Sequence, residues 1–234
     1  MSTHLPESIE ASISQSVQAV KAALADNRLR VQVELVYQEL KPLKVAYQFL
    51  QEFPELGEKV KVLFPDAGSA ALATRDWKDI SYTLRGINEL LEPVQPEDEA
   101  FVLVAPSSIE VQKAEQVAGE VGERPCILLN PQLQDVSVVG IGYAGRQLRE
   151  RFLSTIETAY YLCPLDGGLV YRAYPNDWEI YRENESGDYE LLQTLPTRPM
   201  SEELEDAFAP TQTQQERSGS LLRTLGQFLK SLSS

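Results

Sequence analysis

The chain has 234 residues, of which 43% are hydrophobic and 24% are charged, a composition typical of a soluble protein with one sizeable core. Its formal net charge of −14 disfavours general nucleic-acid binding, because phosphates would be repelled over most of the surface. The single histidine, His4, stands near the amino terminus, so zinc sites and Ser-His or Cys-His catalysis are close to excluded.

Several kinds of segment are not found in the sequence. No apolar run approaches the ~18 residues that a membrane-spanning helix needs. The first residues, MSTHLPESIEASISQ, have neither a basic region nor an apolar core, so we expect no secretory signal and no attached transit peptide. Cys126 and Cys163 lie far apart within apolar segments, which favours two reduced core thiols in a reducing compartment.

The first part of the chain alternates between helical and strand-like patterns. Helices are predicted over 5–25, with Pro6 and Glu7 in the first turn, and over 42–52 and 67–75. Strands are predicted over 29–37 and 60–64, and continuous apolar runs predict buried parallel strands in AFVLVAP and CILLNP. Between these two runs we expect a helix whose N-cap is Ser107 or Ser108. The alternation predicts a layered α/β/α domain with helices on both faces of a sheet.

The pattern changes near residue 137. A helix is predicted over 144–156, and about four strands follow, with turns at 166–168, 175–177 and 185–187. We expect an antiparallel meander that continues the same sheet. Residues 1–196 are therefore predicted to form a single α/β domain with a mixed sheet, in which a parallel part is followed by the meander.

Two further segments follow this domain. Residues 197–217, rich in Pro, Thr, Gln and acidic side chains, predict a flexible linker, and we interpret the acidic SEELEDAF as part of this tether rather than as a metal site. Residues 218–234 predict an amphipathic helix that needs a surface to cover its apolar face, on its own domain, on a membrane or on a protein partner. The residues of that face are Leu221, Leu222, Leu225, Phe228, Leu229 and Leu232.

A candidate ligand site lies where three apolar strands end in similar turns, at 64–66, 105–108 and 130–131. If these strands are parallel, the turns share the carboxyl edge of the sheet, where open α/β sheets hold ligands. The candidate ligand-binding residues of this edge are Asp66, Gly68, Ser69, Ser107, Ser108, Asn130, Arg146 and Arg149.

A structural interpretation of the same turns competes with this one. The turn at Asp66 matches neither the P-loop nor the dinucleotide pattern, and Asp66 as an N-cap explains it without a ligand. The other turns would likewise cap helices, and both arginines would be surface residues. No nucleophile or acid–base pair is identified, and we expect no cofactor and no metal.

Four stretches, LFPDAGSAALATRDW, ILLNPQLQD, RERFLSTIETAYYLCPL and GGLVYRAYPNDWEIYRE, together resemble an uncharacterised domain family of cyanobacteria and plastids. Its plant members include the low photosystem II accumulation proteins and a domain attached to a chloroplast adenylate kinase. The resemblance covers about residues 5–195. It implies a cytoplasmic or stromal photosynthesis-associated protein, whose partner is a photosystem subunit or assembly intermediate. It supplies no catalytic residues, and no adenylate kinase domain is present here.

Three functions are compatible with these observations. The first is a non-catalytic assembly or interaction factor for a thylakoid complex such as photosystem II, cytoplasmic or peripheral at the cytoplasmic face of the thylakoid membrane, with the C-terminal helix as a second contact. The alternative is an enzyme or sensor that binds a phosphorylated small molecule at the strand ends. The third is a regulatory adaptor unrelated to photosystems. The lack of a transit peptide favours a cyanobacterial source.

Overall fold

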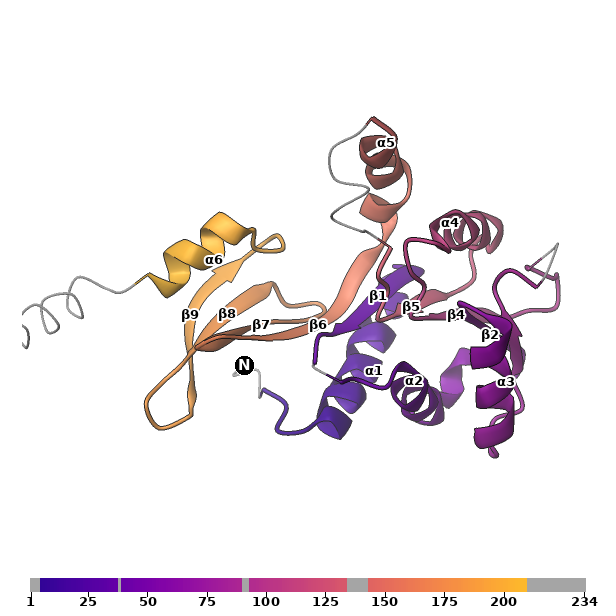
Figure 1. The fold of residues 1–234 in the computed structure, drawn as a ribbon, viewed down its shortest axis with the longest axis horizontal. Coiled ribbons are helices and arrows are strands. Elements are labelled where there is room, and N and C mark those ends of the chain that lie inside the picture. Colours follow the sequence, from indigo (N-terminus) through magenta and orange to yellow (C-terminus); the bar gives the residue numbers. More distant parts are fainter. Residues whose placement is uncertain (1–4, 38, 90–92, 134–142, 210–234) are drawn as a thin grey trace, which may run out of the picture.

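The computed structural model describes residues 5–37, 39–89, 93–133 and 143–209. Within them, nine strands form one sheet in the order β3-β2-β4-β5-β1-β6-β7-β8-β9. The strands from β3 to β6 pair in parallel, and those from β6 to β9 pair antiparallel. The predicted mixed sheet is therefore confirmed, and Figure 1 shows that the long strand β6 joins its two parts.

Each strand lies close to its predicted position where one was predicted. The parallel part consists of β1 (Arg30–Leu35), β2 (Val60–Phe64), β3 (Thr83–Gly86), β4 (Ala100–Val104), β5 (Cys126–Leu129) and β6 (Glu157–Leu165). The meander continues through β7 (Gly168–Ala173), β8 (Trp178–Glu183) and β9 (Tyr189–Leu195). The helices are α1 (Ile9–Ala25), α2 (Pro42–Gln51), α3 (Ala67–Asp76), α4 (Val111–Glu120), α5 (Tyr143–Arg151) and α6 (Ser201–Phe208).

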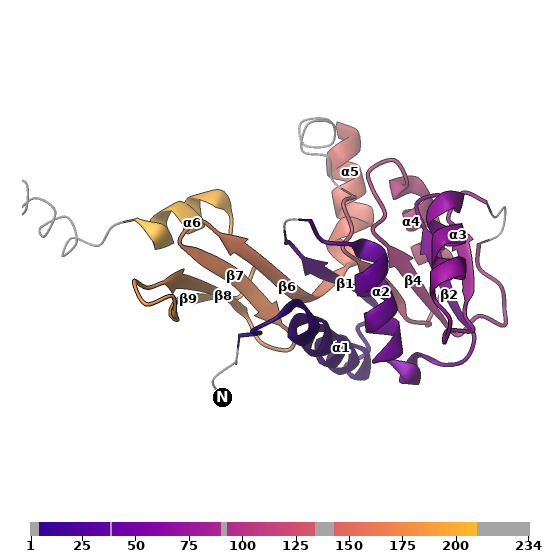
Figure 2. The same ribbon diagram turned by 60° about the horizontal axis from the view of Figure 1, so that its bottom comes forward.

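The helices cover both faces of the sheet, as the strand–helix alternation predicts. α1, α2 and α3 pack on one face, here called the α1 face, whereas α4 and α5 pack on the opposite face, the α4 face. Helix α6 lies on the α4 face of the meander, where Leu204 packs against the cluster that contains Tyr161 and Trp178. The two views in Figures 1 and 2 show these layers.

The burial of the strands follows from this layering. Every residue of β2, β4 and β5 is buried, as expected for parallel strands covered on both faces. Strand β1 lies equally deep in the sheet order, yet its residues alternate between buried and half-buried. Its half-buried positions are Arg30, Gln32 and Glu34. The α4 face of this central strand therefore carries polar side chains.

One strand was missed, and two local expectations were wrong. Strand β3 was not predicted, because it has four residues of alternating burial and is defined by its pairing with β2. The N-cap of α1 is Ser8, whose side chain accepts from the Ala11 amide, so Pro6 and Glu7 precede the helix. Helix α4 begins after Glu110 and has no side-chain cap, so neither Ser107 nor Ser108 is its N-cap.

The predicted linker was also wrong in part. Residues 201–208 form α6. The helix is held on the sheet because Leu204 packs against an apolar cluster and Arg182 donates to the Ala207 carbonyl at 2.8 Å. The rest of the predicted linker after residue 209 and the predicted amphipathic helix over 218–234 lie outside the described residues.

Candidate functional site

The three turns of the candidate site lie along one edge of the sheet. Strands β2, β4 and β5 are consecutive in the sheet and parallel, so their carboxyl ends point the same way. The Pro106 carbonyl accepts from the Gln132 amide at 2.8 Å, which joins the turns after β4 and β5 directly. The predicted shared edge is therefore confirmed.

The turn at Asp66 uses its polar groups within the fold. The Asp66 carboxylate accepts from the amide and the hydroxyl of Ser69, both at 2.8 Å. These hydrogen bonds lower the pKa of Asp66 below its usual value. The end of β3 closes over the loop, because a Cβ added to Gly86 would lie 2.9 Å from the Ala67 nitrogen. The turn from Asp66 through Gly68 to Ser69 is thus a capped helix start.

The turn after β4 is closed in the same way. Ser107 donates from its amide and its hydroxyl to the Glu110 carboxylate, at 3.0 and 2.5 Å, and its hydroxyl accepts from the Ile109 amide at 3.1 Å. Glu110 itself is buried. Ser108, half-buried beside it, completes the turn. These contacts leave the Ser107 side chain with a structural role.

Asn130 prolongs the pairing between β5 and β1 beyond the last strand residue. Its side-chain amide donates to the Leu35 carbonyl at 2.8 Å, and its side-chain oxygen accepts from the Leu35 amide at 3.2 Å. The backbone of Asn130 has φ 49°, a left-handed conformation that asparagine tolerates better than most residues. Asn130 therefore shapes this edge and has both polar atoms occupied.

The two predicted arginines lie elsewhere. Arg146 and Arg149 are exposed on α5, and neither lines a cavity at the strand ends. Arg151, also on α5, binds Glu115 of α4 at 2.6 Å. The structure thus brings the three turns together without adding the positive charge that was expected from α5.

A groove does lie at this edge, between β5 and β1. From β1 the chain continues to α2 on the α1 face, whereas from the neighbouring β5 it continues to Leu133 in the core of the α4 face. Adjacent connections that leave toward opposite faces open a crevice at the strand ends, where α/β sheets bind ligands. The sequence placed the edge correctly, and the strand order decides which part of it is open.

The groove has two parts that meet at Glu34, Pro131 and Gln132. The first part is about 360 Å³ and the second about 580 Å³, both within the range of binding cavities. We call the two together the edge groove. Its remaining lining residues are Leu35, Val36, Tyr37, Glu39, Leu40, Pro42, Ala105 and Asn130 in the first part, and Gln32, Leu133, Leu153, Ile156 and Arg198 in the second.

Glu34 and Arg198 are the charged pair of the second part. Two nitrogens of Arg198 donate to the two carboxylate oxygens of Glu34 at 3.0 and 3.3 Å, a bidentate pair across 164 positions of sequence. Gln32 donates to the same carboxylate at 2.9 Å and to the Thr158 hydroxyl at 2.9 Å. Burial raises the pKa of Glu34, although the positive charge of Arg198 opposes the shift.

Arg198 also rests on aromatic rings of the meander. Its guanidinium lies 4.4 Å from the ring centre of Tyr161 and 5.7 Å from that of Trp178, distances at which cations and aromatic faces attract. Arg172 approaches Trp178 at 5.4 Å and binds Glu157 at 2.7 Å. Arg198 therefore fastens the segment between β9 and α6 to the end of β1.

The residues that shape the second part of the groove were missed by the sequence prediction. One signal for them existed. Strand β1 has the apolar–polar alternation of a half-exposed strand, yet its neighbour β5 and the next strand, β4, are apolar throughout. Polar residues on one face of a central strand indicate that this face lines a cavity or carries a buried polar network. Gln32 and Glu34 are such residues, and both line the second part of the groove.

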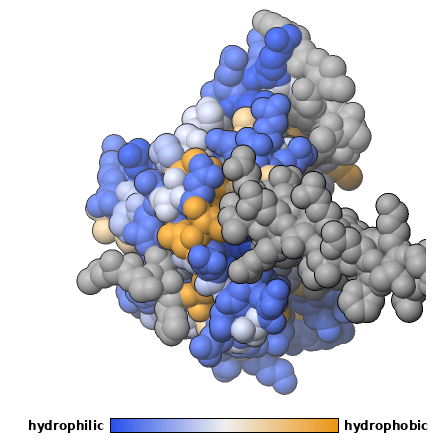
Figure 3. Space-filling model, turned by 90° about the vertical axis from the view of Figure 1, so that its left-hand side faces the viewer, coloured by the Kyte–Doolittle hydropathy of each residue, from blue (hydrophilic) through white to orange (hydrophobic). Residues whose placement is uncertain are grey.

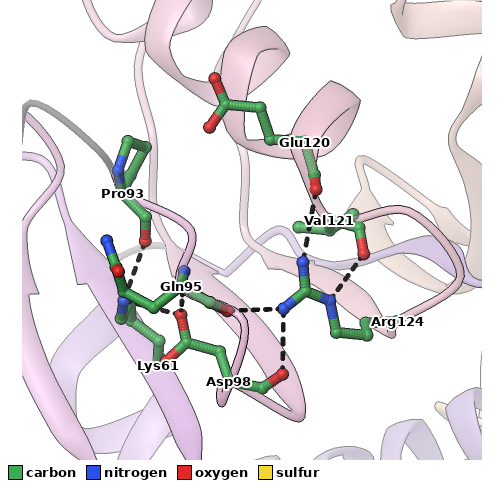
Figure 4. Close-up of polar contacts among 7 residues, drawn as sticks. All are labelled: Lys61, Pro93, Gln95, Asp98, Glu120, Val121 and Arg124. Atoms are coloured by element: carbon green, nitrogen blue, oxygen red, sulfur yellow. Dashed lines mark hydrogen bonds and ion pairs between the residues drawn. The ribbon is translucent and has the colours of Figure 1, made fainter.

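A second polar network lies at the other end of the α4 face and is structural. Lys61 of β2 binds the Asp98 carboxylate at 2.7 Å and donates to the Pro93 carbonyl at 3.0 Å, and both charged side chains are buried. Arg124 donates to the carbonyls of Gln95 and Asp98 at 2.8 and 3.1 Å. Figure 4 shows that these bonds hold the segment before β4 against the sheet.

Two cysteines and a bonded pair of tyrosines lie outside the groove. Both cysteines are free. Cys126 lies in the core as predicted, and burial raises the pKa of its thiol to about 12, so it stays protonated, whereas Cys163 is half-buried rather than in the core. The Tyr160 and Tyr171 hydroxyls donate to the side-chain oxygen of Gln15 at 3.1 and 2.9 Å. In the described ranges, no group of three or more His, Cys, Asp or Glu side chains could hold a metal ion.

Comparison with known families identifies the chain. A sequence model described as "Domain of unknown function (DUF1995)" matches residues 6–206. The chain belongs to this family. The match includes the edge groove and most of α6, so the family domain extends past residue 196, where the sequence pattern predicted its end. No solved structure matches the chain.

Two further observations bear on membranes. None of the helices in the described ranges combines the length and hydropathy that crossing a bilayer requires. The predicted partner-binding or membrane-binding residues between Leu221 and Leu232 lie outside both the described residues and the family match. Their role stays a prediction.

Proposed function

We propose that this DUF1995 protein is a non-catalytic, photosynthesis-associated assembly or interaction factor. It binds a segment of a partner protein in the edge groove, and the partner belongs to a thylakoid complex such as photosystem II. The photosynthetic assignment is supported by the resemblance carried by the stretches around Asp66, Asn130 and Trp178. The binding assignment is supported by the groove.

The observation that carries the proposal is that the central polar side chains of the groove, Glu34, Arg198 and Asn130, are already held by hydrogen bonds. Glu34 is held by Arg198 and Gln32, and Asn130 is held by Leu35. Such walls contribute shape and apolar surface, supplied by Val36, Leu40 and their neighbours, more than free reactive groups. Shape and apolar contact are what recognition of a polypeptide segment requires.

The location of the protein follows from the same proposal. The domain acts in the cytoplasm, and the amphipathic helix over 218–234 brings it to the cytoplasmic face of the thylakoid membrane or to a second site on the partner. A second weak contact raises the overall affinity through effective concentration. Arg223 and Lys230 on the other side of that helix would add a modest attraction to anionic lipids.

A pull-down from a photosynthetic extract after gentle membrane solubilisation tests the proposal. Val36→Asp places a charge on the groove wall, and Leu72→Asp is its matched control, since Val36 is 46% exposed and Leu72, on α3 outside the groove, is 45% exposed. We expect Val36→Asp to reduce recovery of photosystem subunits and Leu72→Asp to leave it unchanged. Equal recovery by both variants would remove the groove from the mechanism.

The predicted amphipathic helix over 218–234 is tested separately. Leu225→Asp combined with Phe228→Asp should weaken association with the membrane or complex while leaving the domain folded, as measured by circular dichroism and by flotation with thylakoid lipids. Unchanged association in this double variant would show that the predicted helix takes no part in binding the membrane or the complex.

Binding of a phosphorylated small molecule is the second candidate, favoured by the position of the groove at the switch between β5 and β1. The carboxylates of Glu34 and Glu39 line the groove, and its arginine is already paired, so a phosphate would meet repulsion there. Thermal-shift titration with nucleotides and sugar phosphates measures this directly. A stabilisation that Val36→Asp abolishes would favour the small molecule over the polypeptide.

A further inference from the structure

The last strand of the sheet, β9, has an open outer edge. In the described residues β9 pairs with β8 on one side and with no strand on the other. It has seven residues, whereas β3 at the opposite edge has four. Figures 1 and 2 show β9 at the end of the meander, away from α1 and α2. An open edge of this length presents backbone donors and acceptors to an added strand.

The side chains beside this edge are apolar on one face. Tyr189 and Leu191 are 41% and 48% exposed. Leu191 stands opposite Tyr181, which belongs to the core of the α1 face, and Tyr189 stands two positions earlier, on the same face. Figure 3 views the molecule from this end, where some hydrophobic surface stands among mostly hydrophilic residues. A strand added here would cover apolar surface on the α1 face.

The other face of the edge and its hairpin are acidic. Glu190 stands opposite Arg182, which donates to the Ala207 carbonyl of α6, so Glu190 lies on the α4 face. Glu185 and Asp188 are exposed in the turn before β9, and residues 183–195 contain no lysine or arginine. Natural edge strands are commonly protected by lysine or proline. β9 has neither, although a register shift near Leu192 interrupts its ladder with β8.

These observations select the occupant by pattern and charge. A second copy of β9 would bring no basic side chain to this acidic edge, since residues 183–195 contain none, and in registers that pair the first halves of the two strands the Glu190 carboxylates would face each other, which is destabilising. A segment with apolar side chains toward Tyr189 and Leu191 and basic side chains toward Glu190 would instead carry a positive charge, which complements the acidic edge. Because side chains alternate along a strand, that segment alternates apolar and basic residues.

We propose that the outer edge of β9 is a β-augmentation surface that accepts an extended, basic segment of a partner protein. Backbone hydrogen bonds to β9 supply affinity, and the alternating side chains supply specificity. None of Tyr189, Glu190 and Leu191 lines the edge groove, so this surface uses other residues than the proposed function, although Tyr189 lies near Tyr37 of the groove.

The test uses the full chain and three short synthetic peptides. The first alternates valine and lysine, the second alternates valine and glutamate, and the third has the composition of the first with the two residue types in separate blocks. Amide hydrogen exchange reports the site, and fluorescence anisotropy reports the affinity. We expect only the first peptide to slow exchange of residues 189–195, with an affinity that falls as salt rises.

Matched variants identify the side chains. Tyr189→Ser combined with Leu191→Ser should weaken binding of the first peptide by at least about tenfold, through the loss of apolar contact. Leu72→Ser, with a similarly exposed leucine on α3, should leave it unchanged. Glu185→Lys with Glu190→Lys should weaken binding and reduce its salt dependence. Glu58→Lys with Glu123→Lys, which makes the same change in net charge at other exposed positions, should not.

Three results would overturn the proposal. One is unchanged exchange of residues 189–195 with the first peptide, and another is equal affinity for all three peptides. The third is a dimer in sedimentation velocity that Leu191→Ser dissociates, since it would assign the edge to a second copy of this chain. Because no photosynthetic extract and no groove variant is involved, the outcome is independent of the test of the proposed function.

Discussion

The two parts of the sheet use the same backbone pairing but are buried differently. In the parallel part, every residue of β2 and β4 is buried, whereas five of the seven residues of β9 are exposed. The parallel strands lie between two helix layers, and the outer meander has α6 on the α4 face. Burial on both faces concentrates stability in the parallel part and leaves open surface on the meander.

Strand β6 belongs to both parts and explains how they meet. It pairs in parallel with β1 and antiparallel with β7, so the edge groove lies next to the boundary between them. Arg198 arrives from the meander side and binds Glu34 on the parallel side. The groove is therefore built by both parts, although its strand ends belong to the parallel one.

The largest effect should come from the buried ion pair of the parallel part. Asp98→Ala leaves the Lys61 ammonium buried without its carboxylate and should lower the free energy of unfolding by about 3–5 kcal/mol. Urea denaturation followed by circular dichroism measures it. Adding Lys61→Met to this variant removes the unpaired charge and should restore much of the loss. If the double variant were no more stable than Asp98→Ala, the loss of stability would come from the segment before β4 that Asp98 holds in place, and not from the unpaired charge of Lys61.

A matched pair of leucines tests the comparison most directly. Leu103→Ala in β4 removes a fully buried side chain and should cost about 2–5 kcal/mol. Leu191→Ala in β9, where the side chain is 48% exposed, should cost less than about 1 kcal/mol. Thermal or urea unfolding of both variants gives the difference. Equal losses would mean that β9 is covered in the native protein.

Breaking the link between the two parts should have a smaller effect. Arg198→Ala removes the ion pair with Glu34 and the contacts with Tyr161 and Trp178, and should cost about 1–2 kcal/mol because the arginine is half-exposed. Tryptophan fluorescence should change as Trp178 gains access to water, and proteolysis after β9 should accelerate. Arg149→Ala, an exposed arginine on α5, is the control. Identical spectra for the two variants would contradict the link.

The smallest effect should come from the turn at Asp66. Asp66→Ala removes the cap of α3 and should cost about 1 kcal/mol at neutral pH. Because the folded-state pKa of this carboxyl is below its ordinary value of 3.8, its stabilisation is present above that pH and is lost as the pH falls through the folded value. The stabilities of the two proteins should therefore converge in acid. A constant difference from neutral pH to acid would contradict the cap.

Much of the fold could be predicted because its signals are local. The apolar runs of β2, β4 and β5 and the turns of the meander reflect burial and backbone preferences that act within a few residues. Strand β3 could not be predicted, since its four residues are ordered by pairing with β2 and by the close approach of Gly86 to Ala67. Helix α6 was missed because the apolar cluster that it covers comes from β6, β7 and β8.

The candidate site divides in the same way. Asp66 as a cap was predicted, because the carboxylate and the amide that it binds are three residues apart. That Asn130 bonds across to Leu35 was not, because the partner is 95 residues away.

The sequence by itself therefore determined most of the element types, the cap at Asp66, the turns of the meander, the mixed character of the sheet and the family of this protein. Only the tertiary structure decided the strand order, and with it the position of the groove between β5 and β1 and of the open edge at β9. The reason is physical. Hydrophobic periodicity and capping depend on neighbours along the chain, whereas strand order depends on which of many apolar surfaces cover one another.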